Sequence, residues 1–155
     1  MELNGVPLHP LVVHAVVVLG PLAALTGLAY AAVPRWRWLL RWPLVVLAAI
    51  VAVVSWVAVA AGQDLLKARP ELAPIVEVHR ERGELMRNMA LGYVLVSAFA
   101  AWALGGISAL ASGRGARESR GPLGRVAAVL LALAAVGLLV TLYLAGDSGA
   151  RAVWG

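Results

Sequence analysis

The chain of 155 residues has no cysteine and few charged side chains, which make up 14% of the sequence. Without cysteine it can form no disulfide, no thiolate-ligated zinc or iron–sulfur site and no covalent c-type haem attachment. Soluble domains are about a quarter charged, so a chain that is 62% hydrophobic, with a mean hydropathy of +0.87, cannot cover a water-exposed globule. The composition excludes a soluble enzyme, a disordered chain and a collagen-like fibre.

Four apolar stretches approach or exceed the length of about 20 residues that a helix needs to cross a bilayer. None of them contains Lys, Arg, Asp or Glu. We therefore expect an all-α integral membrane protein, an up-down four-helix bundle that forms one domain over residues 1–155. The first span is interpreted as retained, because a signal peptide needs a basic start and residues 1–10 hold only Glu2. The predicted spans are residues 11–33, 44–62, 89–111 and 126–146.

The distribution of charge predicts how the bundle lies in the membrane. Four crossings put both termini and the connector 63–88 on one face, and the short turns 34–43 and 112–125 on the other. The short turns carry seven arginines and one glutamate, whereas six basic and seven acidic residues are interleaved on the opposite face. The positive-inside rule favours cytoplasmic turns and extracytoplasmic termini in the inner membrane. The turn arginines are Arg35, Arg37, Arg41, Arg114, Arg117, Arg120 and Arg125.

Tryptophans accompany the arginines of the first turn. Trp36, Trp38 and Trp42 alternate with arginines there, a pattern typical of a membrane interface where indole rings and snorkelling arginines meet the headgroups. The net charge of +5 therefore indicates anchoring to the lipid bilayer, and no nucleic-acid partner is expected.

The charged stretch before the third span has helical periodicity. Apolar positions within residues 71–93 recur at steps of three and four, which predicts an amphipathic helix leading into the span, with Pro74 in its first turn. His79 belongs to the apolar positions, so we expect its ring to face the bundle, with Gly83 leaving space beside it. The apolar positions are Leu72, Ile75, Val76, His79, Gly83, Met86, Ala90 and Tyr93.

The other two histidines lie where the first span begins. His9 precedes Pro10, which suits the first helical position because it has no N–H. His14 lies about 7 Å further along the helix, and an ionisable residue inside a membrane is functional by default. Their spacing turns a helix by about 140°, so the two rings share a face only if His9 flanks the helix. The second and fourth spans add Gln63, Asp64, Asp147, Ser148 and Arg151 to the same end.

Imidazole and carboxylate groups from facing helices are the means by which helical bundles hold metals. One hypothesis is haem b with axial ligands from the first and third spans and arginines pairing its propionates. Another is a compact zinc, iron or copper site, and mixed nitrogen and oxygen ligation suits zinc and iron better than Cu(I). The haem site would use His14, His79, Gly83 and the arginines Arg80, Arg82, Arg87 or Arg151. The metal site would use His9, His14, His79, Asp147 and Asp64.

Each of these residues also has an ordinary structural interpretation. His9 can be a hydrogen-bonded surface residue, and His79 a core histidine satisfied by a backbone carbonyl. Asp64 and Asp147 can each cap a helix or turn. A third hypothesis is accordingly an accessory or structural subunit of a larger membrane complex, with no cofactor of its own. Transport is less favoured, because no span has the broken-helix pattern of a transporter.

Nothing in the sequence favours an independent catalytic activity. Ser55, Ser97 and Ser108 fall within spans or near the opposite face, away from every histidine, so no catalytic triad is expected. The chain also has no glycine-rich phosphate loop.

Three segments resemble one known family. These are Gly5-Val6-Pro7-Leu8-His9-Pro10-Leu11-Val12-Val13-His14, the His-x-x-x-Gly of His79 to Gly83, and Ala145-Gly146-Asp147-Ser148-Gly149-Ala150-Arg151-Ala152-Val153-Trp154. They are similar to the bacterial and archaeal membrane family known as domain of unknown function number twenty-two thirty-one. The resemblance covers the whole chain and implies four spans and a histidine constellation, but no activity. In many members a histidine stands at the position of Asp147, so this chain departs from a four-histidine pattern.

The sequence therefore predicts a small membrane protein with a metal or haem centre at its extracytoplasmic end. Electron transfer or metal binding is the expected use of such a centre. Besides the bilayer, the partners we expect are a membrane redox complex or further copies of the same chain.

Overall fold

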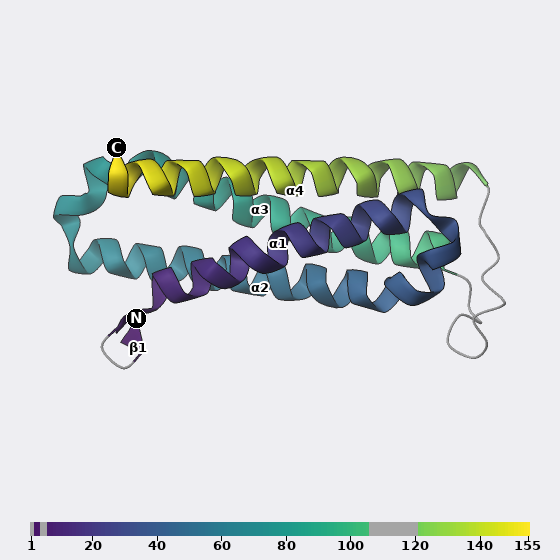
Figure 1. The fold of residues 1–155 in the computed structure, drawn as a ribbon, viewed down its shortest axis with the longest axis horizontal. Coiled ribbons are helices and arrows are strands. Elements are labelled where there is room, and N and C mark those ends of the chain that lie inside the picture. Colours follow the sequence, from purple (N-terminus) through teal and green to yellow (C-terminus); the bar gives the residue numbers. More distant parts are fainter. Residues whose placement is uncertain (1, 4–5, 106–120) are drawn as a thin grey trace.

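The computed structural model describes residues 2–3, 6–105 and 121–155, and it confirms an all-α fold of long helices (Figure 1). Before the first helix, two-residue strands β1 (Glu2–Leu3) and β2 (Val6–Pro7) pair antiparallel. The 3-10 helices η1 (Pro34–Trp36) and η2 (Pro70–Leu72) join the first three helices. The long helices are α1 (Leu8–Ala32), α2 (Arg37–Ala68), α3 (Ala73–Leu104) and α4 (Pro122–Trp154).

All four helices are long and apolar enough to cross a membrane, which confirms the four predicted spans. The helices extend beyond the apolar stretches, because backbone hydrogen bonds continue a helix where its side chains become polar. α2 begins at Arg37, so most of the predicted turn 34–43 is helical. α4 continues past Gly146 to Trp154. α3 ends at Leu104, and the rest of the predicted third span, like Arg114, Arg117 and Arg120, lies outside the described residues.

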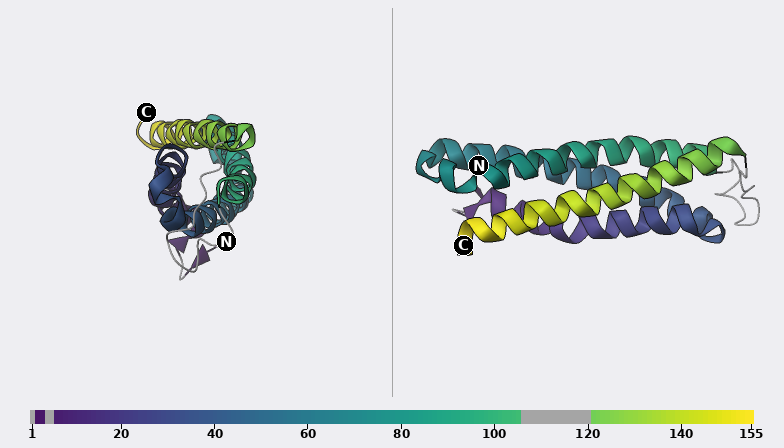
Figure 2. Two further views of the ribbon diagram at one scale, coloured as in Figure 1. Left: turned by 90° about the vertical axis from the view of Figure 1, so that its right-hand side faces the viewer. Right: turned by 90° about the horizontal axis from the view of Figure 1, so that it is seen from above.

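The helices alternate in direction and form a four-sided bundle. α1 and α3 each pack against both α2 and α4, so α1 and α3 lie diagonally opposite each other (Figure 2). Both termini and η2 lie at one end, and η1 lies at the other (Figure 1). We call these the terminal end and the η1 end. The predicted up-down order of the helices is therefore confirmed.

The centre of the bundle is rich in alanine but also holds the large side chains of Tyr30 and Tyr93, and many large apolar side chains cover the outside. Alanines such as Ala23, Ala48 and Ala135 are fully buried, whereas Leu95 is 73% exposed. This arrangement suits a lipid environment, in which close approach of helices through small residues replaces the hydrophobic effect. At Gly27, the absence of a side chain lets Tyr93 of α3 pack directly against α1, because a Cβ atom there would collide with the tyrosine hydroxyl.

The predicted amphipathic extension is the first part of α3. Val76 and His79 are half-buried and Met86 is buried, as their spacing predicts. Ile75 is an exception, because its side chain is 59% exposed. Pro74 lies at the first helical positions, where its missing N–H costs no hydrogen bond.

Candidate functional site

Two histidines from diagonal helices meet at the terminal end of the bundle. His9 of α1 and His79 of α3 have ring centroids 6.0 Å apart, with ring planes at 78° to each other. Both residues are half-buried. α1 and α3 also meet further along the bundle, where the hydroxyl of Tyr93 donates to the carbonyl oxygen of Ala23 at 2.6 Å.

Each ring donates a hydrogen bond to the backbone of a neighbouring helix. The Nδ1 atom of His9 lies 2.8 Å from the carbonyl oxygen of Ala58 in α2. The Nδ1 atom of His79 lies 3.0 Å from the carbonyl oxygen of Ala145 in α4. A carbonyl oxygen only accepts, so Nδ1 must carry the hydrogen in both rings. In the neutral form of each ring, Nε2 therefore holds a lone pair available to a ligand.

A glycine lies beside each ring, one turn after the carbonyl that the ring contacts. A Cβ atom at Gly62 would stand 3.1 Å from Nδ1 of His9. A Cβ atom at Gly149 would stand 3.0 Å from Cε1 of His79. Both helices thus present the same local pattern, Ala58-x-x-x-Gly62 and Ala145-x-x-x-Gly149. In each case the alanine carbonyl fixes the ring and the glycine gives it room.

Ser148 completes the surroundings of His79. Its hydroxyl lies 3.4 Å from Nδ1 of His79 and is hydrogen-bonded to the carbonyl oxygens of Leu144 at 2.9 Å and Ala145 at 3.0 Å. The serine is only 5% exposed. It therefore adds an acceptor on the same edge of the ring as the carbonyl, which further favours the tautomer with hydrogen on Nδ1.

His14 does not join this pair. It is exposed on α1, and its Nδ1 atom lies 2.6 Å from the carbonyl oxygen of Pro10 in the same helix. The expected inward orientation of His14 is therefore wrong. Because α1 is already a regular helix from Leu8, the rotation of about 140° between positions 9 and 14 allows only one of the two to face inward. The rotation of α1 about its axis in the bundle places His9 inward and His14 outward.

The expected acidic residues and arginines form ion pairs on the helix surfaces. Asp147 pairs with Arg151 at 3.1 Å and with Arg82 at 3.4 Å, and Arg82 also donates to the carbonyl oxygen of Leu144 at 3.2 Å. Asp64 pairs with Lys67 at 3.3 Å. The contacts of Arg82 tie α3 to α4, whereas the Asp147–Arg151 pair lies within α4 and the Asp64–Lys67 pair within α2.

Arg80 and Gly83 make other contacts than those expected for a haem site. Arg80 pairs with Glu77 at 2.6 Å and Glu84 at 3.4 Å on the exposed side of α3. A Cβ atom at Gly83 would meet nothing within 4 Å, so the expectation that this glycine makes room for His79 is wrong. Gly149 has that role, and the Ala-x-x-x-Gly spacing could not have marked it, because the same spacing also occurs at Ala23–Gly27 and Ala101–Gly105.

The histidine pair has the dimensions of a site for one ion. A metal about 2.1 Å from a ring nitrogen stands about 3.2 Å from the ring centroid, so two rings on one ion have centroids at most about 6.4 Å apart. The observed 6.0 Å lies within this limit. Among the described residues, no group of three or more His, Asp or Glu side chains could hold a metal. Within the part of the chain that the structure describes, the histidine pair could therefore offer two ligands to a metal ion.

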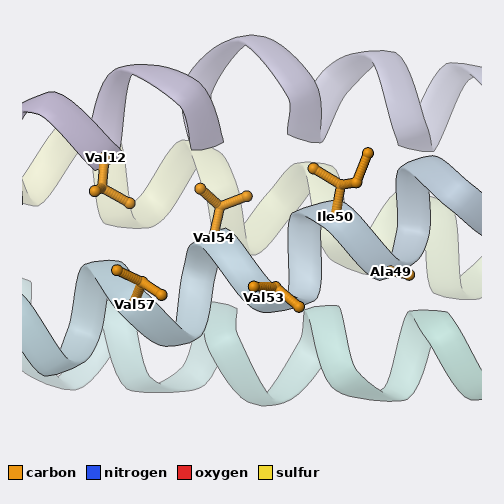
Figure 3. A pocket seen from close by; sticks show the side chains of 6 residues that line it. All are labelled: Val12, Ala49, Ile50, Val53, Val54 and Val57. Carbon is orange, nitrogen blue, oxygen red and sulfur yellow. The ribbon is translucent and has the colours of Figure 1, made fainter.

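The described hollows on the outside of the bundle are apolar and lie away from the histidines. One, of about 340 Å³, is lined by aliphatic side chains of α2 together with Val12 of α1 (Figure 3). The other lies between Trp56 of α2 and Leu91 of α3. Neither offers a polar group that could orient a substrate, so the polar chemistry of the described chain at this end centres on the histidine pair. The lining of the first comprises Val12, Ala49, Ile50, Val53, Val54 and Val57.

Fold and site together define a four-helix integral membrane protein with paired histidines at the end that carries both termini. The pattern that defines the family described as "Predicted membrane protein (DUF2231)" matches residues 5–155, and the chain belongs to this family. No curated protein and no solved structure is similar enough to the chain to count as a match.

Proposed function

We propose that this membrane protein binds a transition metal through the Nε2 atoms of His9 and His79. The observation that carries the proposal is the pair of Nδ1 contacts to the carbonyl oxygens of Ala58 and Ala145. Metal-ligating histidines almost always donate their other ring N–H in this way, which fixes the ring and raises its basicity. Here both rings are fixed by different helices and stand 6.0 Å apart.

A single ion suits the surroundings better than haem b. Gly62 and Gly149 let the rings lie directly against α2 and α4, where an added Cβ atom would stand only 3.0–3.1 Å from the ring atoms. A haem held between two axial histidines needs a wide flat space between the rings. Imidazole suits zinc, copper and iron. With two protein ligands, the remaining coordination positions belong to water or an exogenous ligand, and a redox-active metal would serve electron transfer.

The position of the pair supports a centre near one membrane surface. His9 is the second residue of α1, and Gly62 and Gly149 lie near the ends of α2 and α4. If the arginine-rich turns are cytoplasmic, this surface is the extracytoplasmic one of the inner membrane. Asp147 and Asp64 lie at the same end, but each is held in ion pairs with basic side chains, so neither is part of the proposed ligand set.

The test compares three histidine variants of the purified native protein by elemental analysis and absorption spectroscopy. We expect one metal per chain in the unaltered protein, its loss in His9→Ala and His79→Ala, and its retention in His14→Ala. His14 is the matched control, because it is the same residue type on α1 but is exposed. A Soret band lost with the metal would identify haem. Metal-free native protein, or loss only in His14→Ala, would overturn the proposal.

A second candidate function is an accessory or structural subunit of a larger membrane complex, or of a homo-oligomer. The two Nδ1 contacts favour it, because they tie α1 to α2 and α3 to α4 without any ligand. His9→Asn separates the two candidates, since the asparagine amide can donate to the carbonyl oxygen of Ala58 while offering no imidazole lone pair. We expect this variant to keep its thermal stability and lose the metal. If native protein is metal-free and co-purifies with a larger assembly, the structural function stands instead.

A further inference from the structure

The described part of the η1 end contains arginines and tryptophans. The described residues 20–56, 95–105 and 121–135, which form this end, contain four arginines and neither Asp nor Glu. Arg35 and Arg125 are exposed, Arg41 is half-buried and Arg37 is buried. The exposed positive charges of Arg35 and Arg125 give this end a field that attracts anions.

The arginines of the α1–α2 junction differ in what their guanidinium groups do. Arg37 donates from Nε to the carbonyl oxygen of Tyr30 at 3.0 Å and from Nη2 to that of Ala31 at 3.1 Å, which caps the C-terminus of α1. Arg37 is therefore a structural residue. Arg35 instead lies on its neighbour Trp36, with Cζ 5.7 Å from the ring centroid. Arg41 lies on Trp42 at the same distance.

Stacking on an indole leaves the anion-binding edge of a guanidinium available. The cation–π contact uses the face of the planar group, whereas its N–H donors point outward in the plane and match phosphate oxygens. For the exposed Arg35, stacking on Trp36 also restricts the side chain, which lowers the entropy lost on binding. Arg35 is thus prepared to donate to a phosphate that approaches from the membrane surface.

The exposed indoles set the depth at which that phosphate would lie. Trp36, Trp38 and Trp42 are 47%, 47% and 50% exposed. Half-exposed tryptophans at the end of a membrane-spanning bundle occupy the headgroup level of the bilayer. We propose that the η1 end selectively binds the headgroup phosphates of anionic phospholipids, with Arg35 as the principal donor and Arg125 of α4 adding charge. This inference is independent of the histidine pair.

The experiment measures which lipids the full chain retains. The protein is reconstituted in nanodiscs of equal parts phosphatidylglycerol and phosphatidylcholine, and the bound lipids are identified by native mass spectrometry after release. Unaltered protein should retain phosphatidylglycerol preferentially. Arg35→Gln should lower that preference about fivefold, and Arg35→Gln with Arg125→Gln about 25-fold, because each arginine near an anionic surface contributes about a factor of five.

The matched control is Arg69→Gln, an exposed arginine that adjoins the proline-initiated turn η2 at the opposite end. It should leave the lipid preference unchanged. Equal preference in unaltered protein and in Arg35→Gln, or an equal loss in Arg69→Gln, would overturn the proposal. Displacement of phosphatidylglycerol by millimolar inorganic phosphate alone would also overturn it, since the ligand would then be free phosphate. Circular dichroism checks that each variant is folded. Because Arg35 is exposed, its substitution should not disturb the fold, so the single variant tests the proposal even if the double variant does not fold.

Discussion

Replacing Gly149 with alanine would place a methyl group against the His79 ring. The new Cβ would stand 3.0 Å from Cε1 and 3.1 Å from Nδ1, whereas ordinary contact begins at 3.4 Å. The ring must therefore move by about 0.4 Å. Because the carbonyl oxygen of Ala145 lies one turn before Gly149 on the same face of α4, this movement lengthens the 3.0 Å hydrogen bond from Nδ1 beyond the range of a good hydrogen bond.

Two opposing effects determine the change in stability. Alanine stabilises a helix relative to glycine by about 1 kcal/mol, and weakening the hydrogen bond of a half-buried group costs about 1–2 kcal/mol. Gly146→Ala is the matched control, because a Cβ atom there meets nothing within 4 Å. We expect Gly149→Ala to be less stable than Gly146→Ala by about 1–2 kcal/mol.

The assay is unfolding in mixed micelles titrated with dodecyl sulfate, followed by circular dichroism, together with metal titration of the same samples. If the histidine pair binds metal, Gly149→Ala should also weaken metal binding about 10- to 100-fold, the usual effect of disturbing a hydrogen bond behind a ligand. Equal stability of the two alanine variants would refute the reasoning about the His79 contact. Equal metal affinity with unequal stability would refute only its connection to the metal.

Two further substitutions test how the bundle is held together. Arg37→Gln should lower the free energy of unfolding by about 2–3 kcal/mol, because the guanidinium donates to the carbonyl oxygens of Tyr30 and Ala31; the same micelle titration measures it. Tyr93→Phe should lower it by about 1 kcal/mol, since the buried hydroxyl donates to the carbonyl oxygen of Ala23 at 2.6 Å, and thermal unfolding followed by tryptophan fluorescence measures the loss.

Exposed residues of the same types serve as controls for these two substitutions. Arg69→Gln and Tyr143→Phe alter side chains on the surface, Tyr143 being 71% exposed, and each should change the free energy of unfolding by less than about 0.5 kcal/mol. If the buried and exposed members of a pair have the same effect, the hydrogen bonds named above do not stabilise the bundle.

The number and order of the helices could be predicted from the sequence, but their ends could not. The length of an apolar run shows whether a helix can cross the hydrocarbon layer of the membrane. It does not report where the helix stops, because a polar side chain on a helix beyond the membrane leaves the backbone hydrogen bonds unchanged. α4 therefore passes through Gly146 and Asp147 without interruption.

The orientation of His79 was predictable because its own neighbours supply the periodicity of an amphipathic helix. Which histidine of α1 faces inward was not, because α1 is apolar on all sides and a uniformly apolar helix has no pattern that distinguishes core from lipid. The start of α1 at Leu8 brings position 9 into the regular helix, and the rotation of α1 about its axis then turns His9 inward and His14 outward.

The sequence by itself determined that the chain enters a bilayer, crosses it four times and carries its histidines towards one end, because these follow from composition, length and parity. Only the tertiary structure decided that His9 and His79 meet, that Ala58 and Ala145 fix their rings, and that Gly62 and Gly149 make room for them. The physical reason is that these contacts join residues at least 49 positions apart, and their formation depends on how the helices are rotated about their axes.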